Sequence, residues 1–150
     1  MISKKTKYAI HALLYLAKKY ESGELSLISQ ISEKENIPKK FLETILLDLK
    51  NAGILGSKKG KGGGYYLLKK PSEVNLAEII RLFDGAIALV SCATYKYYEP
   101  CKECPDEAVC GIRDVFIDVR NETVKQLKQS TLANILERER ILKEELHSKS

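Results

Sequence analysis

The sequence has no long hydrophobic run, no tryptophan and only two histidines among its 150 residues. Its longest stretch of aliphatic side chains, Ala86 to Val90, falls far short of the about 20 residues that a membrane-spanning helix needs. The lysine-rich start has the charge of a signal peptide, but no small-residue cleavage site follows it. No Ser/His/Asp, Cys/His or paired-carboxylate arrangement is visible. We therefore expect a cytoplasmic protein that is not an enzyme.

Arginine is also missing from the first part of the chain, and this absence exposes an asymmetry of charge. Residues 1–71 hold 14 lysines and six acidic residues, a net charge of +8, whereas residues 72–150 have a net charge of −3 and all four cysteines. With 44% hydrophobic residues, the chain is able to bury one compact core. A basic half beside an acidic, cysteine-bearing half indicates a polyanion-binding module joined to a second function.

The basic half contains three segments with helical spacing of apolar residues. The first predicts an amphipathic helix that ends near Glu21, and the hydroxyl of Ser26 is placed to cap the second. Pro38 suits the first position of the third helix, and Gly53 is able to take the left-handed conformation at its end. The third helix is expected to bury Phe41, Leu42, Ile45, Leu46 and Leu49. Two short helices joined by a tight turn are a helix-turn-helix candidate.

Two short strands around a glycine-rich turn follow the third helix and predict a β-hairpin, so the unit is a winged helix-turn-helix. Asn75 is expected to cap a fourth helix that closes at Gly85. Apolar residues then recur at helical spacing over about 20 residues. They are Ile112, Val115, Phe116, Val119, Thr123 and Leu127. A small domain rarely covers so long a helix, so we expect it to pair with its copy in a second subunit.

The expected fold is therefore mainly α: a winged helix-turn-helix with a small two-stranded wing, plus a long C-terminal dimerisation helix. Residues 1–85 form the DNA-binding domain, 86–111 a cysteine-bearing sensor loop, and 112–150 the dimerisation helix and tail. The charged tail from Glu137 onward is expected to fray.

The predicted wing combines lysines with glycines, and two other interpretations of this composition are less suitable. The Walker pattern of a nucleotide-binding loop is absent and a strand follows the glycines, while a plain tight hairpin needs no lysines. A cationic tip that enters the minor groove of DNA explains both residue types. The third helix would contact base edges from its N-terminal residues rather than merely face solvent. The expected DNA contacts are Ser26, Pro38, Lys39, Lys40, Glu43, Thr44, Lys58, Lys59, Gly60 and Lys61.

The four cysteines follow the pattern Cys92-x₈-Cys101-x₂-Cys104-x₅-Cys110. Disulfides are rare in cytoplasmic proteins, and a structural zinc site usually shows two Cys-x₂₋₄-Cys knuckles where this loop has one. Iron–sulfur clusters tolerate such irregular loops, and thiols without any metal also fit the spacing. A thiol oxidoreductase built on Cys101 and Cys104 is disfavoured, because no βαβ unit surrounds them.

The segment from Asp48 to Pro71 resembles the signature of the Rrf-type family of winged-helix regulators, which includes the iron–sulfur regulator IscR, the nitric-oxide sensor NsrR and the cysteine-metabolism repressor CymR. The resemblance covers nearly the whole chain. It implies a homodimeric transcription factor that binds double-stranded DNA at a pseudo-palindromic operator. Glu43 would discriminate bases in the major groove, and Lys59-Gly60 would enter the minor groove, with lysine in place of the usual, planar arginine.

The resemblance also implies ligands for a [2Fe–2S] or [4Fe–4S] cluster at Cys92, Cys104 and Cys110. The fourth-ligand histidine of IscR-like proteins falls at Arg113, and the N-terminal aspartate of NsrR-like proteins at about Lys7, neither of which is able to ligate iron. The additional Cys101, or another group, must then serve. Such a regulator would sense iron, redox state or nitric oxide. The alternatives are a cluster-free regulator controlled by thiol oxidation or a protein partner, and a zinc-stapled interaction module.

Overall fold

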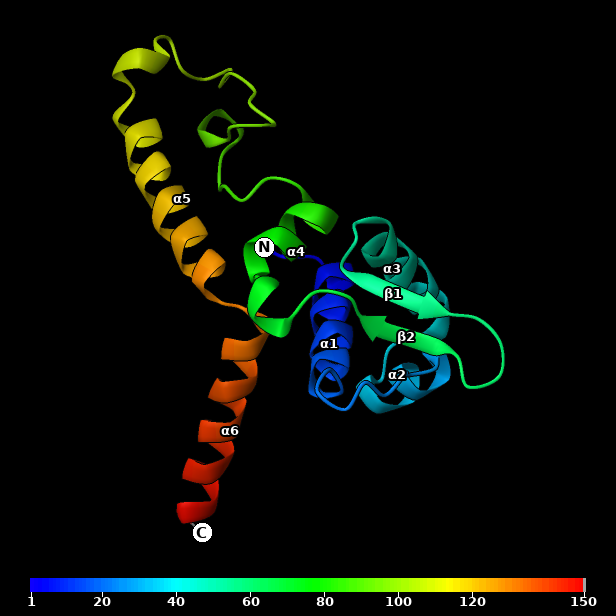
Figure 1. Cartoon of the computed structure of the whole chain (residues 1–150). Coiled ribbons are helices and arrows are strands. Elements are labelled where there is room, and N and C mark those ends of the chain that lie inside the picture. Colours follow the sequence, from blue (N-terminus) through cyan, green and yellow to red (C-terminus); the bar gives the residue numbers. More distant parts are fainter. Residues whose placement is uncertain (150) are drawn as a thin grey trace.

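The computed structural model describes residues 1–149 and is mainly helical, with one two-stranded antiparallel sheet, as predicted. Its elements in chain order are α1 (Lys4–Lys18), α2 (Ile28–Glu35), α3 (Lys39–Asn51), β1 (Leu55–Lys58), β2 (Gly64–Leu67), η1 (Pro71–Glu73), α4 (Leu76–Asp84), η2 (Ser91–Ala93), η3 (Glu107–Val109), α5 (Gly111–Gln129) and α6 (Leu132–Ser148). Figure 1 shows α1–α4 and the hairpin gathered on one side of the molecule, and α5 and α6 as two long rods on the other.

One hydrophobic core holds the winged helix-turn-helix together. Helix α1 lies at its centre and packs against α3, α4 and α6, because its apolar residues recur every three to four positions. The buried stripe of α3 consists of Leu42, Ile45, Leu46 and Leu49, all without exposed surface. Leu132 at the start of α6 is equally buried, so the last helix is anchored in the same core.

The turn between α2 and α3 is held by local hydrogen bonds. Asn36 takes the left-handed conformation that ends α2, and the buried Ile37 follows it. The Ile37 N–H donates to the carbonyl of Ser32 at 3.0 Å, and the Ser32 hydroxyl donates to the carbonyl of Ile37 at 2.6 Å. These contacts fix the direction in which α3 leaves the turn.

The prediction that Ser26 caps α2 is wrong. The helix begins two residues later, and its N-cap is Leu27, whose N–H donates to the side chain of Gln30 at 2.7 Å. Ser26 is fully buried and extended, and its backbone exchanges two hydrogen bonds with Tyr65 of β2, at 3.0 and 2.7 Å. The competing contact is therefore a β-bridge to the wing, which removes the Ser26 hydroxyl from the surface.

Three further expectations are corrected at helix positions. Helix α1 ends at Lys18, three residues before the expected boundary, and Pro38 precedes α3 as its N-cap instead of occupying its first position. Phe41 is 57% exposed, because it lies beside the buried stripe of α3. Its ring packs at a tilted angle against the ring of Tyr8.

The charged tail does not fray within the described residues, since α6 continues to Ser148. Arg140 bridges Glu137 and Glu144, one turn before and one turn after it. Oppositely charged pairs at this spacing stabilise an exposed helix, which explains the continuation. Of the expected tail, only residue 150 lies outside the described residues.

Asn75, the N-cap of α4, connects this helix to the start of α6. The side chain of Asn75 accepts a hydrogen bond from the Glu78 N–H at 3.0 Å, which confirms the predicted cap. Asn75 also forms a β-bridge with Thr131. The winged unit and the C-terminal helices are thus connected at a short, hydrogen-bonded joint.

Candidate functional site

The first two turns of α3 present polar side chains that have no ion-pair partner within residues 1–149. Lys39, Lys40, Glu43 and Thr44 are all exposed, and none of the three charged ones takes part in a salt bridge. They project from the N-terminal end of the second helix of a helix-turn-helix, which is the end that contacts bases in such motifs. The geometry therefore places four of the expected contact residues together on one surface.

The C-terminal end of α3 differs, because its polar side chains already have partners within the chain. Asp48 pairs with Lys5 at 3.1 Å, and the Lys50 ammonium donates to the Ser57 hydroxyl at 2.7 Å. These contacts join α3 to α1 and to the wing. The available charge of the helix is thus concentrated at its N-terminal end.

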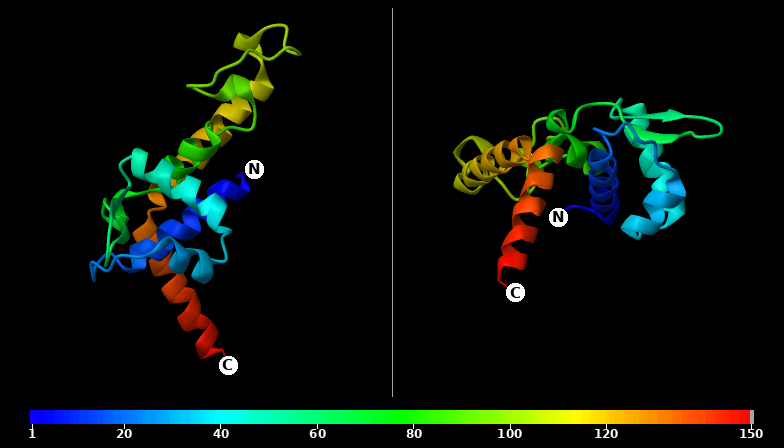
Figure 2. Two further views of the ribbon diagram at one scale, coloured as in Figure 1. Left: turned by 90° about the vertical axis from the view of Figure 1, so that its right-hand side faces the viewer. Right: turned by 60° about the horizontal axis from the view of Figure 1, so that its bottom comes forward.

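The wing is a hairpin in which Leu55 pairs with Leu67 and Lys58 with Gly64. Gly60 and Gly62 adopt positive φ angles of 90° and 79° in its tip. A side chain at Gly63 would place its Cβ 2.2 Å from the carbonyl oxygen of Lys58, so the turn requires glycine there. In the right-hand view of Figure 2, the tip extends beyond α2 and α3.

Three lysines and one glycine of the expected contacts lie exposed at this tip: Lys58, Lys59, Gly60 and Lys61. None of these lysines forms a salt bridge within the part of the chain that the structure describes. Pro38 is also exposed, next to Lys39. Ser26 is the exception among the expected DNA contacts, because its burial keeps its hydroxyl from any ligand.

All four cysteines are free, and all line one cavity of about 640 Å³ between the loop and the start of α5. Cys92 lies buried in η2, whereas Cys101 is exposed and its thiol donates to Glu103 at 3.2 Å. Cys110 is the N-cap of α5, and its Sγ accepts a hydrogen bond from the Arg113 N–H at 3.4 Å. The loop thus brings the expected ligands to one cavity.

The surroundings of the thiols alter their acidity in opposite directions. The Arg113 N–H, helped by the neighbouring Cys104 thiol, lowers the pKa of Cys110. Partial desolvation and the hydrogen bond with Cys110 raise the pKa of Cys104, and the hydrogen bond to the Glu103 carboxylate raises that of Cys101. The lowered pKa of Cys110 favours its thiolate, which is the metal-binding form of cysteine.

Four thiols match the donor set of an iron–sulfur cluster in type and number. Within residues 1–149, however, no three His, Cys, Asp or Glu side chains converge on one point where a metal ion would be held. Arg113, at the position where the resemblance expects a histidine ligand, instead donates from its Nε to the carbonyl of Cys92 at 3.0 Å. Loading a cluster would therefore require the thiols to move toward one another.

Helix α5 exposes an apolar stripe at its N-terminal half. Ile112, Val115 and Val119 are 70%, 58% and 40% exposed. Isolated apolar side chains are common on protein surfaces, whereas contiguous exposed apolar patches are typical of interaction surfaces. No helix of residues 1–149 is long and apolar enough to cross a membrane.

One notable side chain was missed by the sequence analysis. Arg120 of α5 is only 7% exposed, and its Nη1 donates to the carbonyl of Ala93 in η2. No local pattern distinguishes it from the other arginines, because its partner is 27 residues away in an irregular segment.

Comparison with known proteins agrees with this geometry. The model of the Rrf2 family, described as an iron-dependent transcriptional regulator, matches residues 2–138. An Rrf2-like HTH-type transcriptional regulator of Rhodobacter capsulatus is 43% identical over 138 residues, covering 91% of this chain and 92% of the relative. CymR of Bacillus subtilis is 31% identical over 134 residues, covering 89% of this chain and 88% of CymR.

The solved structure of this CymR, the global cysteine regulator of its organism, superposes with a TM-score of 0.74 at 27% identity and covers 90% of this chain and 95% of CymR. The structural and the sequence similarity to CymR thus cover nearly the same share of this chain. The chain belongs to the Rrf2 family of transcriptional regulators.

Proposed function

We propose that this regulator acts in the cytoplasm as a homodimer that binds a pseudo-palindromic operator in double-stranded DNA. The observation that carries the proposal is the unpaired polar face at the start of α3 beside the exposed lysine–glycine wing. Helix α3 occupies the major groove and the wing tip the adjacent minor groove.

The side chains at the start of α3 divide into two chemical roles. Lys39 and Lys40 donate to the O6 and N7 acceptors of guanine, and Glu43 accepts from the N4 amino group of cytosine. Thr44 supports either contact with its hydroxyl, and Pro38 packs beside them at the helix start. The wing residues Lys58, Lys59, Gly60 and Lys61 approach phosphates and the minor groove, which adds affinity without sequence preference.

The exposed stripe of Ile112, Val115 and Val119 pairs with the same stripe of a second copy. The two-fold symmetry of this dimer then presents two copies of α3 to the same face of DNA. The half-sites of the operator are expected about 34–36 Å, or a multiple of that distance, apart. Selection of random duplexes by the purified protein tests this arrangement. Inverted repeats at one fixed spacing support it, whereas single unpaired half-sites contradict it.

The loop of residues 86–111 is the sensor in this proposal. Cys92, Cys104 and Cys110 hold an iron–sulfur cluster, and Cys101 supplies the fourth thiolate. The match to a family described as iron-dependent and the four thiols around one cavity support this assignment. Such a cluster, when bound, responds to iron supply, electrons and nitric oxide. Because Cys110 caps α5, a rearrangement of the loop is transmitted directly to the dimerisation helix.

Anaerobic purification followed by absorption spectroscopy and by iron and sulfide analysis tests the cluster. We expect a coloured protein with equal iron and sulfide, and loss of both in Cys92→Ala. The matched control, Ser91→Ala, alters the neighbouring residue of η2 and leaves iron and sulfide unchanged. A colourless protein without iron and sulfide contradicts the assignment.

A second candidate is a cluster-free regulator controlled by thiol oxidation or a protein partner. The hydrogen-bonded Cys104 and Cys110 thiols and the similarity to CymR favour it. Operator titration of the iron-free protein before and after thiol oxidation, with the oxidised thiols identified by mass spectrometry, separates the two candidates. Only this one predicts a change of operator affinity in iron-free protein. Stoichiometric zinc without operator binding would instead favour a zinc-stapled interaction module.

A further inference from the structure

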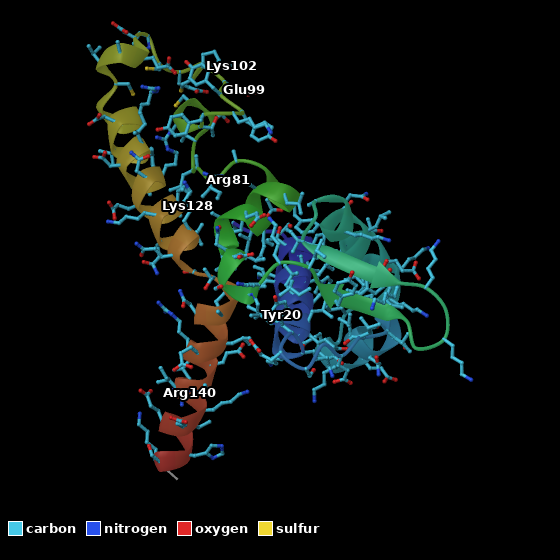
Figure 3. All side chains as sticks on the ribbon, in the orientation of Figure 1. Tyr20, Arg81, Glu99, Lys102, Lys128 and Arg140 are labelled. Atoms are coloured by element: carbon cyan, nitrogen blue, oxygen red, sulfur yellow. The ribbon has the colours of Figure 1, made fainter. Side chains whose placement is uncertain are left out.

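A second cavity, of about 590 Å³, lies between α4, the loop around η2 and α5. Four cationic side chains and two aromatic rings line it: Arg81, Lys96, Arg120, Lys128, Tyr95 and Tyr97. None of its lining residues is acidic. In Figure 3, Arg81 of α4 and Lys128 of α5 lie close together in the space between the two helices.

Arg120 is a buried cation of this cavity without a counter-ion. Its guanidinium stacks on Tyr95 at 3.9 Å from the ring centroid, and its Nε and Nη2 donate to the amide oxygen of Asn121 at 3.1 and 2.8 Å. Its Nη1 donates to the carbonyl of Ala93. Among residues 1–149, no carboxylate lies within ion-pair distance of it. Buried charges are normally paired, since removing an ion from water is costly.

The other three cations add to this excess of positive charge. Arg81, Lys96 and Lys128 are exposed, and none forms a salt bridge within the described part of the chain. The nearest acidic side chain of α4, Asp84, already accepts the Ser3 N–H at 2.9 Å and does not line the cavity. Like charges gathered around one hollow repel each other unless an anion enters it.

We propose that this cavity, the cation pocket, binds a small anion that carries two or more carboxylate or phosphate groups. Its volume lies within the range of small-molecule sites. Arginine forks bind such groups with two parallel hydrogen bonds, and lysines add point charges. The tyrosine rings cover an apolar or planar part of the ligand.

The cation pocket is separate from the apolar stripe of α5. At about 100° per residue, Arg120, Val124 and Lys128 centre about 150° around the helix from Ile112, Val115 and Val119. A second copy that packs along the stripe therefore leaves the pocket open. The pocket also differs from the cysteine cavity, with which it shares no lining residue.

A bound anion would draw together Arg81, at the end of the winged unit, and Lys128, on the dimerisation helix. It would thus stabilise one arrangement of the two α3 helices of a dimer and change operator affinity. This consequence rests on the proposed function, whereas anion binding itself does not.

Isothermal titration with pyrophosphate and with citrate, at constant ionic strength, tests the pocket. We expect saturable binding of one anion per chain, and about tenfold weaker binding in Arg81→Gln and in Lys128→Gln, since each removes one charge-assisted contact. Lys125→Gln is the matched control, because it removes the same charge from an exposed position of α5 outside the pocket. It should bind as the parent protein does.

Two outcomes overturn the proposal. Absence of saturable binding of both anions does so directly, and equal weakening by Lys125→Gln shows only general attraction to a basic surface. If neither anion binds and Arg120→Met dissociates the dimer, a carboxylate of the second copy is the counter-ion. Pyrophosphate binding without citrate binding assigns a phosphate ligand, and the reverse assigns a carboxylate. Operator binding measured without either anion keeps the proposed function separate from this test.

Discussion

The winged unit is built around one core of buried apolar side chains, to which Leu132 of α6 contributes, whereas no residue between 86 and 129 belongs to this core. Leu42, Leu46 and Leu49 of α3 have no exposed surface, but Val109 and Ile112 are 79% and 70% exposed. All four cysteines also lie between residues 86 and 129, and all four are free thiols. The winged unit thus has its own core within one chain, whereas the exposed apolar side chains and free thiols of residues 86–129 fit the proposed dimer contact and the proposed sensor.

The largest expected effect concerns the core of the winged unit. Leu46→Ala should lower the free energy of unfolding by about 2–5 kcal/mol, because it leaves a cavity among fully buried neighbours. Urea denaturation measures it. Val109→Ala, at an exposed position of the cysteine loop, is the control and should unfold as the parent protein does. Similar losses for both variants would contradict the contrast between the regions.

Dimerisation is the next largest effect. Val115→Glu places a charge on the apolar stripe of α5 and should give a folded monomer, with about 100-fold weaker operator binding because the two half-sites are no longer linked. Sedimentation, circular dichroism and DNA titration measure these properties. Lys125→Glu, on the other side of α5, should remain dimeric. A dimeric Val115→Glu protein would refute the stripe as the interface.

The two DNA-contacting elements should respond differently to mutation. Glu43→Ala should reduce discrimination between the best and a mismatched operator by about 1–3 kcal/mol, because it removes a base contact. Lys59→Ala should weaken binding to all sequences and lower the slope of log K against log salt by about 1. Lys143→Ala, on α6, leaves both quantities unchanged. Equal effects of Glu43→Ala and Lys59→Ala on all sequences would refute the assigned roles.

The smallest effect is expected at Asp84, where the N-terminus meets α4. Partial burial opposes ionisation, but hydrogen bonds from the Ser3 hydroxyl and N–H and from Thr6 outweigh it and lower the pKa of Asp84. Its contribution to stability is therefore present above the carboxyl pKa of the unfolded chain, about 3.9, and is lost as pH falls through the lower folded value. Asp84→Asn should slightly lower the melting temperature at pH 7.

The parent protein and Asp84→Asn should then converge in melting temperature as the pH falls through the folded pKa of Asp84. A difference that persists unchanged at low pH would show that the carboxylate charge is not involved. Glu145→Gln, on the exposed part of α6, serves as the charge-matched control.

The elements of the winged unit were predictable because their determinants are local. Apolar spacing identified α3, Gly53 its end and Asn75 the start of α4, and each agrees with the structure. Ser26 was misassigned because its partner, Tyr65, lies 39 residues further along the chain. Extended backbone angles suit both an N-cap and a β-bridge, and Asn75 combines the two roles. Only the three-dimensional packing therefore decides which role Ser26 takes.

The arrangement of residues 86–111 was not predictable from local patterns. Its loop is held by distant arginines of α5: Arg113 bonds the carbonyl of Cys92, and Arg120 that of Ala93. Cysteine spacing indicated the ligand type, but the direction of each thiol depends on these contacts. The cation pocket could not be predicted from local sequence patterns for the same reason.

The most direct measurement is operator affinity in one anaerobic preparation, before and after iron is removed with a chelator. A regulator whose sensor region is completed by a cluster should change affinity by about tenfold or more, since allosteric coupling typically amounts to 1–3 kcal/mol. The change should disappear in Cys92→Ala. Identical affinities of the iron-loaded and iron-free protein would contradict a sensing role for the cluster.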